Sequence, residues 1–317
     1  MTTTSRIVSV FGATGLQGGS VVDALLKHGI FTPRAISRDP QSEASKKLAA
    51  RGVQVVKGDA LNKTGLVGAL RGSEAVFAVT VPTFSGSPDQ SELAQGRNIV
   101  DAAKAAGVQF LVWSSLPSIA ELSGGKYKNA VHYEEKAAVR AYTAQSGLRH
   151  ASLLLPAFLE NLYTRPLLKK SDAAQDTDNA PDKYTLTLPI FMSSDTQAWA
   201  WIGRDVPAAV LALLTNYTDP DKEGEIDAKT FPVVTAAMTC AELAGRVGMA
   251  LDAEVSFTSA PPTGLLARDE MFVSHAEYSG LYTATPVPNP DLVALGMQFS
   301  TVGEFLESEV RPRFGKK

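Results

Sequence analysis

The sequence predicts an α/β fold, with a doubly wound parallel sheet in the N-terminal half and a smaller α+β lobe in the C-terminal half. Three observations support this prediction. An apolar run at residues 7–11 leads through a glycine-rich turn into apolar positions at helical spacing. Short apolar runs and helical patterns then alternate as far as Tyr163, which is typical of parallel strands joined by helical crossovers. Beyond Tyr163 the periodicity weakens.

The turn that follows the first strand reads GATGLQG, with glycines at Gly12, Gly15 and Gly18. Gly12 lets the chain turn sharply out of the strand. Gly15 has no Cβ and lets a pyrophosphate approach the backbone, and Gly18 lets the helix pack closely on the sheet. The N–H groups and dipole of that helix would face the phosphates. The spacing is that of short-chain and extended dehydrogenases, so it predicts a dinucleotide site in a Rossmann domain covering residues 1–163.

Further strands and helices follow in alternation. We expect strands at residues 34–37, 53–56, 75–79, 110–113 and 149–155, and helices at residues 42–50, 62–70, 91–106 and 131–145. The second strand ends at Ser37 and Arg38, where an acidic residue would bind the ribose 2′-hydroxyl of NAD and a basic residue the 2′-phosphate of NADP. Arg38 therefore favours NADP(H), with NAD(H) as the second choice. The alternative for Arg38 is a solvated loop arginine.

The third strand ends at Asp59 and Ala60. A short acidic side chain at this position can meet the adenine amino group. The alternative is that Asp59 only shapes the turn or caps the next helix. After the fourth strand, a polar loop at residues 83–89 precedes the next helix.

Residues 164–317 are predicted to form the smaller lobe, over the carboxyl ends of the strands where ligands bind in open α/β sheets. Some of its segments would pack back on the first sheet. The polar stretch 170–182 reads as a loop or mobile segment. We expect strands at residues 184–188, 231–235 and 254–258, and helices at residues 206–215, at residues 240–250 and from Val302. Five aromatic residues would wall a pocket or belong to the core: Phe158, Tyr163, Phe191, Trp199 and Trp201.

The composition narrows the classes of function. The chain has 317 residues, 44% hydrophobic residues and a net charge of −3, without a concentrated Lys/Arg stripe, so we expect no direct nucleic-acid binding. There is no long apolar span, and a strand directly after MTTTS leaves no room for a signal peptide, so we expect no membrane association. The single Cys240 fits a reducing compartment, the cytoplasm or nucleus. With four histidines and no His/Cys cluster, a metal site is not expected.

The candidate catalytic residues follow the fifth strand. Typical short-chain dehydrogenases place a Ser there, and a Tyr-x-x-x-Lys pair on the next helix, where the Lys lowers the Tyr pKa and holds the nicotinamide ribose. This chain has Ser114 and Ser115, then Lys136. His132 lies four residues before the lysine and Tyr133 three before it, so either ring shares a helix face with Lys136. The alternative for Lys136, in the run Glu-Glu-Lys, is a solvated helix face. His28, His150 and His275 have no partner that spacing identifies and are interpreted as structural or surface residues.

Several motifs together resemble the NmrA-like family, a group of atypical short-chain dehydrogenase relatives. They are GATGLQGG, SRDP, VVKGDALN, VWSSLP, VHYEEKAAVR and PAFLENLY, with looser similarity through GRDVPAAVLALL and the final EFLE. The resemblance implies that the turn cradles a pyrophosphate, Arg38 meets the 2′-phosphate, Asp59 and Ala60 border the adenine, and Lys136 reaches the nicotinamide ribose. It also implies that residues after the fourth and sixth strands line the cofactor or close over the nicotinamide. The implied residues of the pyrophosphate turn and of these two segments are Gly12, Ala13, Thr14, Gly15, Leu16 and Gln17, then Thr80, Val81 and Pro82, then Pro156, Phe158 and Leu159.

The family resemblance implies two functions. Some relatives reduce small molecules with NADPH, which predicts a reductase of a quinone, enone or carbonyl compound, with Lys136 positioning the ribose and relaying a proton through His132 or Tyr133. Other relatives bind dinucleotide without turnover and regulate a protein partner as redox sensors. The departure from Tyr-x-x-x-Lys favours the second function, and the retained Ser114 and Lys136 favour the first.

Overall fold

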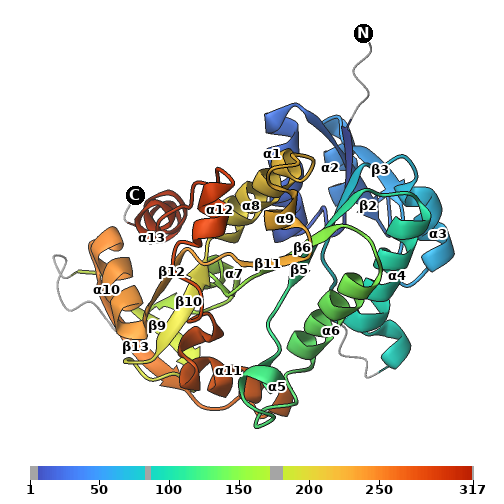
Figure 1. Ribbon diagram of the computed structural model, residues 1–317. Helices are drawn as coiled ribbons and strands as arrows, with labels where there is room; N and C mark the ends of the chain where they lie inside the picture. Colours follow the sequence, from blue (N-terminus) through green and yellow to red (C-terminus); the bar gives the residue numbers. More distant parts are fainter. Residues whose placement is uncertain (1–5, 83–86, 172–180, 316–317) are drawn as a thin grey trace.

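The computed structural model describes residues 6–82, 87–171 and 181–315. Seven parallel strands form its main sheet (Figure 1). They are β1 (Arg6–Val10), β2 (Phe31–Ser37), β3 (Gln54–Lys57), β4 (Ala75–Ala78), β5 (Phe110–Ser115), β6 (His150–Leu154) and β11 (Lys229–Pro232). Their order is β11-β6-β5-β4-β1-β2-β3. The strand order reverses between β1 and β4, which is where open α/β sheets form their ligand crevice. The predicted doubly wound sheet is confirmed.

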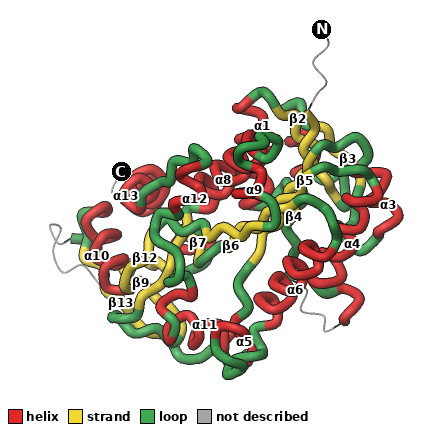
Figure 2. Tube along the Cα trace, viewed as in Figure 1, coloured by secondary structure: helices red, strands yellow, loops and turns green. Residues whose placement is uncertain are grey.

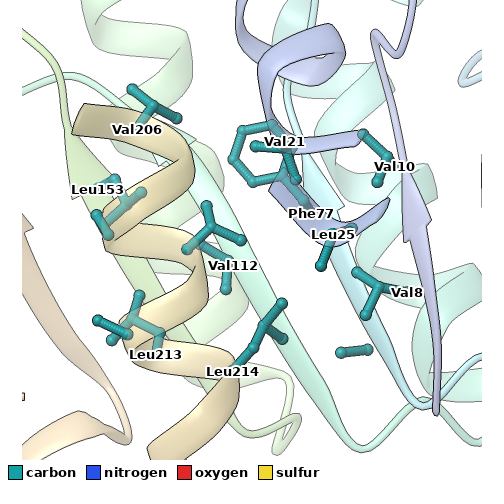
Figure 3. Close-up of a cluster of buried hydrophobic side chains, with 14 of the residues drawn as sticks. Val8, Val10, Val21, Leu25, Phe77, Val112, Leu153, Val206, Leu213 and Leu214 are labelled. Atoms are coloured by element: carbon teal, nitrogen blue, oxygen red, sulfur yellow. The ribbon is translucent and has the colours of Figure 1, made fainter. Parts of the chain in front are cut away.

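Two helical layers cover this sheet. One contains α1 (Leu16–His28) and α8 (Ile202–Asn216), and the other α3 (Lys63–Leu70), α4 (Glu92–Ala105) and α6 (Val131–Gln145). Side chains alternate along the strands, so Phe77 and Val112 face the first layer while Val76 and Trp113 face the second. Figure 3 shows the first of these clusters, in which Val206, Leu213 and Leu214 of α8 point toward Val112 and Leu153 of the sheet.

The smaller helices and turns of the first half complete its connections. They are α2 (Glu43–Ala50), the 3₁₀ turn η1 (Pro88–Gln90) and α5 (Ile119–Leu122). Strand β2 begins at Phe31, earlier than predicted, because Phe31 already pairs with Arg6 of β1. Residues 83–86 of the predicted polar loop lie outside the described residues.

Strands between residues 157 and 260 build two small sheets beside the main one (Figure 2). One has the order β12-β10-β7 and the other β13-β9-β8. Their strands are β7 (Ala157–Phe158), β8 (Leu168–Lys170), β9 (Lys183–Pro189), β10 (Thr196–Ala200), β12 (Ala236–Thr239) and β13 (Glu254–Ala260). The associated helices are α7 (Asn161–Thr164), α9 (Glu223–Ile226), α10 (Cys240–Leu251), α11 (Leu266–Glu277), α12 (Pro290–Ala294), α13 (Val302–Phe305) and α14 (Arg311–Phe314). The 3₁₀ turn η2 (Ser279–Leu281) follows α11, and the π-helical segment η3 (Leu306–Val310) joins α13 to α14.

The second half also contributes to the main sheet. Its β11 pairs with β6, and its α8 packs against α1. Several elements have no predicted counterpart, among them the strands β7, β8, β10 and β12 and the helices α7, α9, α11 and α12. Lys170, at the start of the predicted polar loop 170–182, ends β8 instead, and residues 172–180 of that loop lie outside the described residues.

In the described part of the chain, the helices are too short or too polar to cross a membrane. Within the same residues, the His, Cys, Asp and Glu side chains form no group that could hold a metal ion.

Candidate functional site

The glycine turn has the conformation that its sequence predicts. Gly12 has a φ of +63°, which favours glycine, and a Cβ on it would lie 2.8 Å from Val79 Cγ1. A Cβ on Gly18 would lie 2.3 Å from the carbonyl oxygen of Gly12, so helix α1 can pack at this distance only with glycine there. Gly15 is the N-cap of α1, and a Cβ on it would stay 3.4 Å from Gly12 O. The absence of a Cβ at Gly15 therefore leaves the outer surface of the turn accessible and is not needed for the packing of the turn.

The N-terminus of α1 suits an anionic group. Thr14, Gly15 and Leu16 are exposed there, and the first turn of α1 contains no acidic residue and no side-chain cap. The N–H groups of a first helical turn have no partner within the helix, and the helix dipole places positive charge there. These residues therefore fit a pyrophosphate.

The loop after β2 is ordered around Asp39 and presents Arg38. The Asp39 carbonyl oxygen accepts hydrogen bonds from the Ser42 and Ser45 hydroxyls, both at 2.9 Å, and its Oδ1 accepts one from Gln41 N at 2.9 Å. Arg38 is exposed, and the structure records no hydrogen bond or ion pair between it and another described residue. Its guanidinium is thus available to a ligand on a fixed turn.

Asp59 shapes the turn after β3. Its Oδ1 accepts a hydrogen bond from Leu61 N at 2.9 Å, whereas helix α3 is capped by Asn62, which accepts one from Gly65 N. The Ala60 carbonyl accepts a hydrogen bond from Asn98 of α4 at 3.0 Å, which ties this turn to the second helical layer. Asp59 therefore shapes the turn, as the alternative reading expects, and its carboxylate is exposed.

Lys136 belongs to a buried charge cluster and not to a solvated helix face. It is 8% exposed, and its Nζ lies 2.8 Å from Glu92 Oε1 and 3.0 Å from Thr80 Oγ1. The Thr80 hydroxyl in turn donates to Glu92 Oε1 at 2.6 Å. The Trp113 ring lies beside the ammonium, 5.3 Å from Nζ to the ring centre. Three elements meet here, because Thr80 follows β4, Glu92 begins α4 and Lys136 lies in α6.

The surroundings of Lys136 set its charge. Burial lowers the pKa of the Lys136 ammonium, and the carboxylates of Glu92 and Glu135 oppose that shift. His132, on the same helix, has its pKa lowered by burial; the charge of Glu92 opposes this shift and that of Lys136 adds to it. Glu92 is thus the nearest counter-charge of the predicted catalytic lysine.

The two serines after β5 have different partners. Ser114 donates a hydrogen bond to Gln17 Oε1 at 2.7 Å, which joins the end of β5 to the glycine turn. Ser115 donates to the backbone carbonyl of Lys136 at 3.2 Å. The end of β5 therefore links the glycine turn to the helix that carries Lys136.

Tyr133 points to the C-terminal half of the chain. Its hydroxyl lies 2.7 Å from His275 Nε2, and His275 Nδ1 lies 3.0 Å from Gln197 Oε1. The His132 ring meets the Tyr133 ring edge-on at a centroid distance of 4.7 Å. Burial raises the pKa of Tyr133 above its usual range and lowers the pKa of His275 to about 3. The Tyr133 hydroxyl is therefore engaged with a neutral His275, and the structure records no hydrogen bond between it and Lys136.

The remaining predicted site residues lie at the carboxyl ends of β4 and β6. Val81 and Pro82 are exposed after the buried Thr80. Pro156 and Leu159 are buried, and Phe158 is half-buried in β7, beside Ala200 of β10. The aromatic residues Phe191, Trp199 and Trp201 are buried in the core cluster of the small sheets, so these three are core residues.

Two residues of the site have no signal in the sequence as site residues. Glu92 reads as an ordinary first-turn glutamate after the N-cap Ser91, and His275 lies 142 residues from Tyr133. Only the fold brings them to α6.

The fold and the glycine turn define a Rossmann-type α/β protein. The profile of the NmrA-like family matches residues 3–306, so the chain belongs to the NmrA-like family, as its motifs predict.

Curated relatives carry the same family name. The chain is 40% identical over 157 residues to the NmrA-like family domain-containing oxidoreductase notA of Aspergillus sp. (strain MF297-2), over 48% of this chain and 45% of that protein. It is 34% identical over 254 residues to the oxidoreductase lnbB of Aspergillus flavus, over 77% of this chain and 73% of that protein. The match to the first of these spans less than half of the relative.

Solved structures share the fold. The crystal structure of NmrA, a negative transcriptional regulator, in complex with NADP has a TM-score of 0.77 at 17% identity, over 98% of this chain and 97% of the other. The NADPH-dependent quinone oxidoreductase of Escherichia coli, complexed with NADPH, has a TM-score of 0.69 at 22% identity, over 94% and 98%. The same fold thus occurs in a regulator and in an enzyme.

Proposed function

We propose that this protein binds NADP(H) in the crevice at the carboxyl ends of β1 and β4 and uses NADPH to reduce a quinone, enone or carbonyl compound. The observation that carries the proposal is the buried Lys136, held at the end of β4 by Glu92 and Thr80. Ser115 of β5 donates a hydrogen bond to the backbone carbonyl of Lys136. Moving a charged ammonium from water into the protein interior costs free energy, so its burial here indicates a role beyond packing. The names of the curated oxidoreductases support the same reading.

The chain's residues fit the cofactor on three counts. The N-terminus of α1 has no side-chain cap and no acidic residue in its first turn, Gly15 leaves the backbone accessible, and Arg38 supplies a cation for a 2′-phosphate. NADPH would supply the hydride. Lys136 would orient the cofactor's ribose through its N–H donors and stabilise negative charge that develops on the acceptor. With the Tyr133 hydroxyl engaged by His275, the half-buried His132 and Lys136 itself are the groups left to move a proton.

Replacing Lys136 tests the reductase. We expect wild-type protein to oxidise NADPH with at least one class from a panel of quinones, enones and ketones, and Lys136→Met to lower that turnover by about 100-fold or more. Methionine is unbranched and only one atom shorter than lysine, which limits the cavity. The matched control is Lys27→Met, an exposed lysine at the far end of α1, which should keep wild-type turnover. Tight NADPH binding by the wild type without turnover on the whole panel would contradict the reductase.

Arg38 tests the cofactor preference. We expect Arg38→Ala to raise the Kd for NADPH by about 10- to 100-fold, since it removes a charge-assisted contact with the 2′-phosphate. The Kd for NADH, which lacks the 2′-phosphate, should change little, so NADH is the control ligand for this variant. Titration of both cofactors by calorimetry measures the ratio. An equal change, or no change, for the two cofactors would identify Arg38 as a solvated loop residue.

A second function rests on a specific observation. The residue four before Lys136 is His132, and the hydroxyl of Tyr133 is engaged by His275, so the chain departs from the usual catalytic pair. We propose a dinucleotide-dependent regulator of a protein partner as the alternative. Dinucleotide binding without turnover on the panel would favour it.

A further inference from the structure

Glu92 occupies an unusual position for a charged residue. It is the first residue of α4, where a side chain normally reaches solvent, yet it is 1% exposed. Its backbone N–H donates to Glu135 Oε2 at 2.7 Å, so the start of α4 is tied to α6. Glu92 Oε1 takes both the Thr80 hydroxyl and the Lys136 ammonium, while Glu92 Oε2 has no hydrogen-bond partner among the described residues. Among the described residues, Oε1 thus has two hydrogen-bonding partners, and the buried Oε2 has none.

Stability alone does not account for this pair. The desolvation of two buried charges roughly cancels their attraction, and apolar residues of similar volume often stabilise a protein as well or better. An unpartnered buried oxygen adds a further cost. The arrangement does, however, fix one property of Lys136. With the Thr80 hydroxyl donating to Glu92, Thr80 Oγ1 accepts from Lys136, so the two acceptors set the direction of Nζ, and the Glu92 carboxylate favours its charged form.

We propose that Glu92 is the positioning residue of the dinucleotide site, which keeps Lys136 as an ammonium and fixes its Nζ at the end of β4. The proposal rests on the NADP(H) binding proposed above. It adds that the Glu92 carboxylate sets the charge and the position of the Lys136 ammonium. An ammonium has three N–H donors. Glu92 Oε1 and Thr80 Oγ1 take two of them, and the Thr80 carbonyl oxygen lies farther away, at 3.4 Å. The third donor thus has only this long contact with the Thr80 carbonyl oxygen, which a hydroxyl of the bound cofactor would replace.

The charged groups around Lys136 make this control testable. Glu92 faces it from α4, and Glu135 and His132 lie on its own helix, while β5 contributes the Trp113 ring. Burial lowers the pKa of Lys136, and Glu92 is the largest opposing influence. Removing the Glu92 charge leaves only Glu135 to oppose burial. The Lys136 ammonium should then lose its proton at a lower pH than in the wild type.

The experiment measures the Kd of NADP⁺ by calorimetry from about pH 7 to about pH 10, a range that spans the loss of a proton from a lysine with a lowered pKa. In the wild type, affinity should fall as pH rises through the Lys136 pKa. In Glu92→Gln the midpoint of that fall should move down by at least about one pH unit, the size expected from losing a direct counter-charge. Glu307→Gln, at an exposed carboxylate of η3 outside the site, should retain the wild-type midpoint. Lys136→Met should show no such fall, which assigns the midpoint to Lys136.

The outcomes separate this inference from the proposed function. If the wild type does not bind NADP⁺, the proposed function fails. If the wild type binds and Glu92→Gln binds more weakly at every pH with an unchanged midpoint, Glu92 is only structural and the inference is wrong. If Glu92→Gln does not fold, Glu92→Asp replaces it, since it keeps the charge but withdraws it by one methylene. A smaller downward shift of the midpoint is then expected, and an unchanged midpoint overturns the inference.

Discussion

Gly18→Ala is expected to prevent stable folding, with a loss of more than about 4 kcal/mol in the free energy of unfolding. The added Cβ would lie 2.3 Å from Gly12 O and 2.4 Å from Gly12 C, which are backbone atoms of the turn itself. No side chain can rotate away to make room. Helix α1 would have to move away from the sheet. This movement is costly because Val21, Val22 and Leu25 of α1 are buried in the large core cluster between the helix and the sheet. Chemical denaturation, or the soluble yield if no folded protein is obtained, measures the effect.

Gly15→Ala is the matched control in the same turn. Its Cβ would lie 3.4 Å from Gly12 O, and Gly15 has an extended conformation with φ −98°, which alanine adopts readily. We expect the free energy of unfolding to stay within about 1 kcal/mol of wild type, the usual cost of alanine at an N-cap. The Kd for NADPH should rise by about 10-fold or more, because the Cβ keeps the pyrophosphate from the backbone. A stable Gly18→Ala, or a Gly15→Ala with unchanged affinity, would contradict the roles assigned to these glycines.

The N-terminal half could be predicted well because its signals are local. The central parallel strands are buried on both faces and therefore appear as apolar runs, as in β5, where all six residues are buried. Each crossover helix buries one apolar stripe, and Ser91 and Asn62 cap helices as expected for their residue types. The doubly wound parallel sheet and the family follow from these signals and from the motifs, and the structure and the family profile confirm both.

The elements missed in the C-terminal half lack such signals. Strands β8 and β12 have three and four residues, too few for a period to be visible. Strand β10 buries the polar Gln197, and helix α11 buries Ser274 and His275 instead of an apolar stripe. The candidate site could also be predicted only in part. Lys136 could be placed from its motif, but Glu92 becomes its counter-charge only because the fold brings α4 against α6.

His275→Phe is expected to lower the free energy of unfolding at pH 7 by about 2–4 kcal/mol. Phenylalanine has a similar shape but removes both hydrogen bonds of the ring. It leaves the buried Tyr133 hydroxyl without its His275 partner, and Gln197 Oε1 keeps only the bond from Ala198 N. Because Gln197 Oε1 can only accept, His275 Nδ1 carries the proton and Nε2 accepts from Tyr133. Tyr133→Phe together with His275→Phe should therefore cost less than the sum of the two single changes, which a double-mutant cycle of denaturation measurements detects.

The cost of His275→Phe should also depend on pH. The pKa of His275 is lowered to about 3 in the folded protein, through burial and the nearby His132, whereas an unfolded histidine titrates near 6.5. Between these values the unfolded state binds a proton that the folded state does not, so wild-type stability falls as pH decreases from about 6.5. At pH 5 this loss is about 2 kcal/mol, and the phenylalanine variant does not share it.

The difference in stability between wild type and His275→Phe should thus narrow by about 2 kcal/mol from pH 7 to pH 5. Buried carboxylates such as Asp205, whose pKa is raised by burial, titrate alike in both proteins and cancel in the comparison. His28→Gln, at an exposed ring of α1, is the matched control and should follow the wild-type curve. A difference that stays constant with pH would mean that His275 binds a proton as readily in the folded protein as in the unfolded chain. That outcome would exclude a neutral His275 as the acceptor of the Tyr133 proton, and Tyr133 would return as a candidate proton donor to the site beside Lys136.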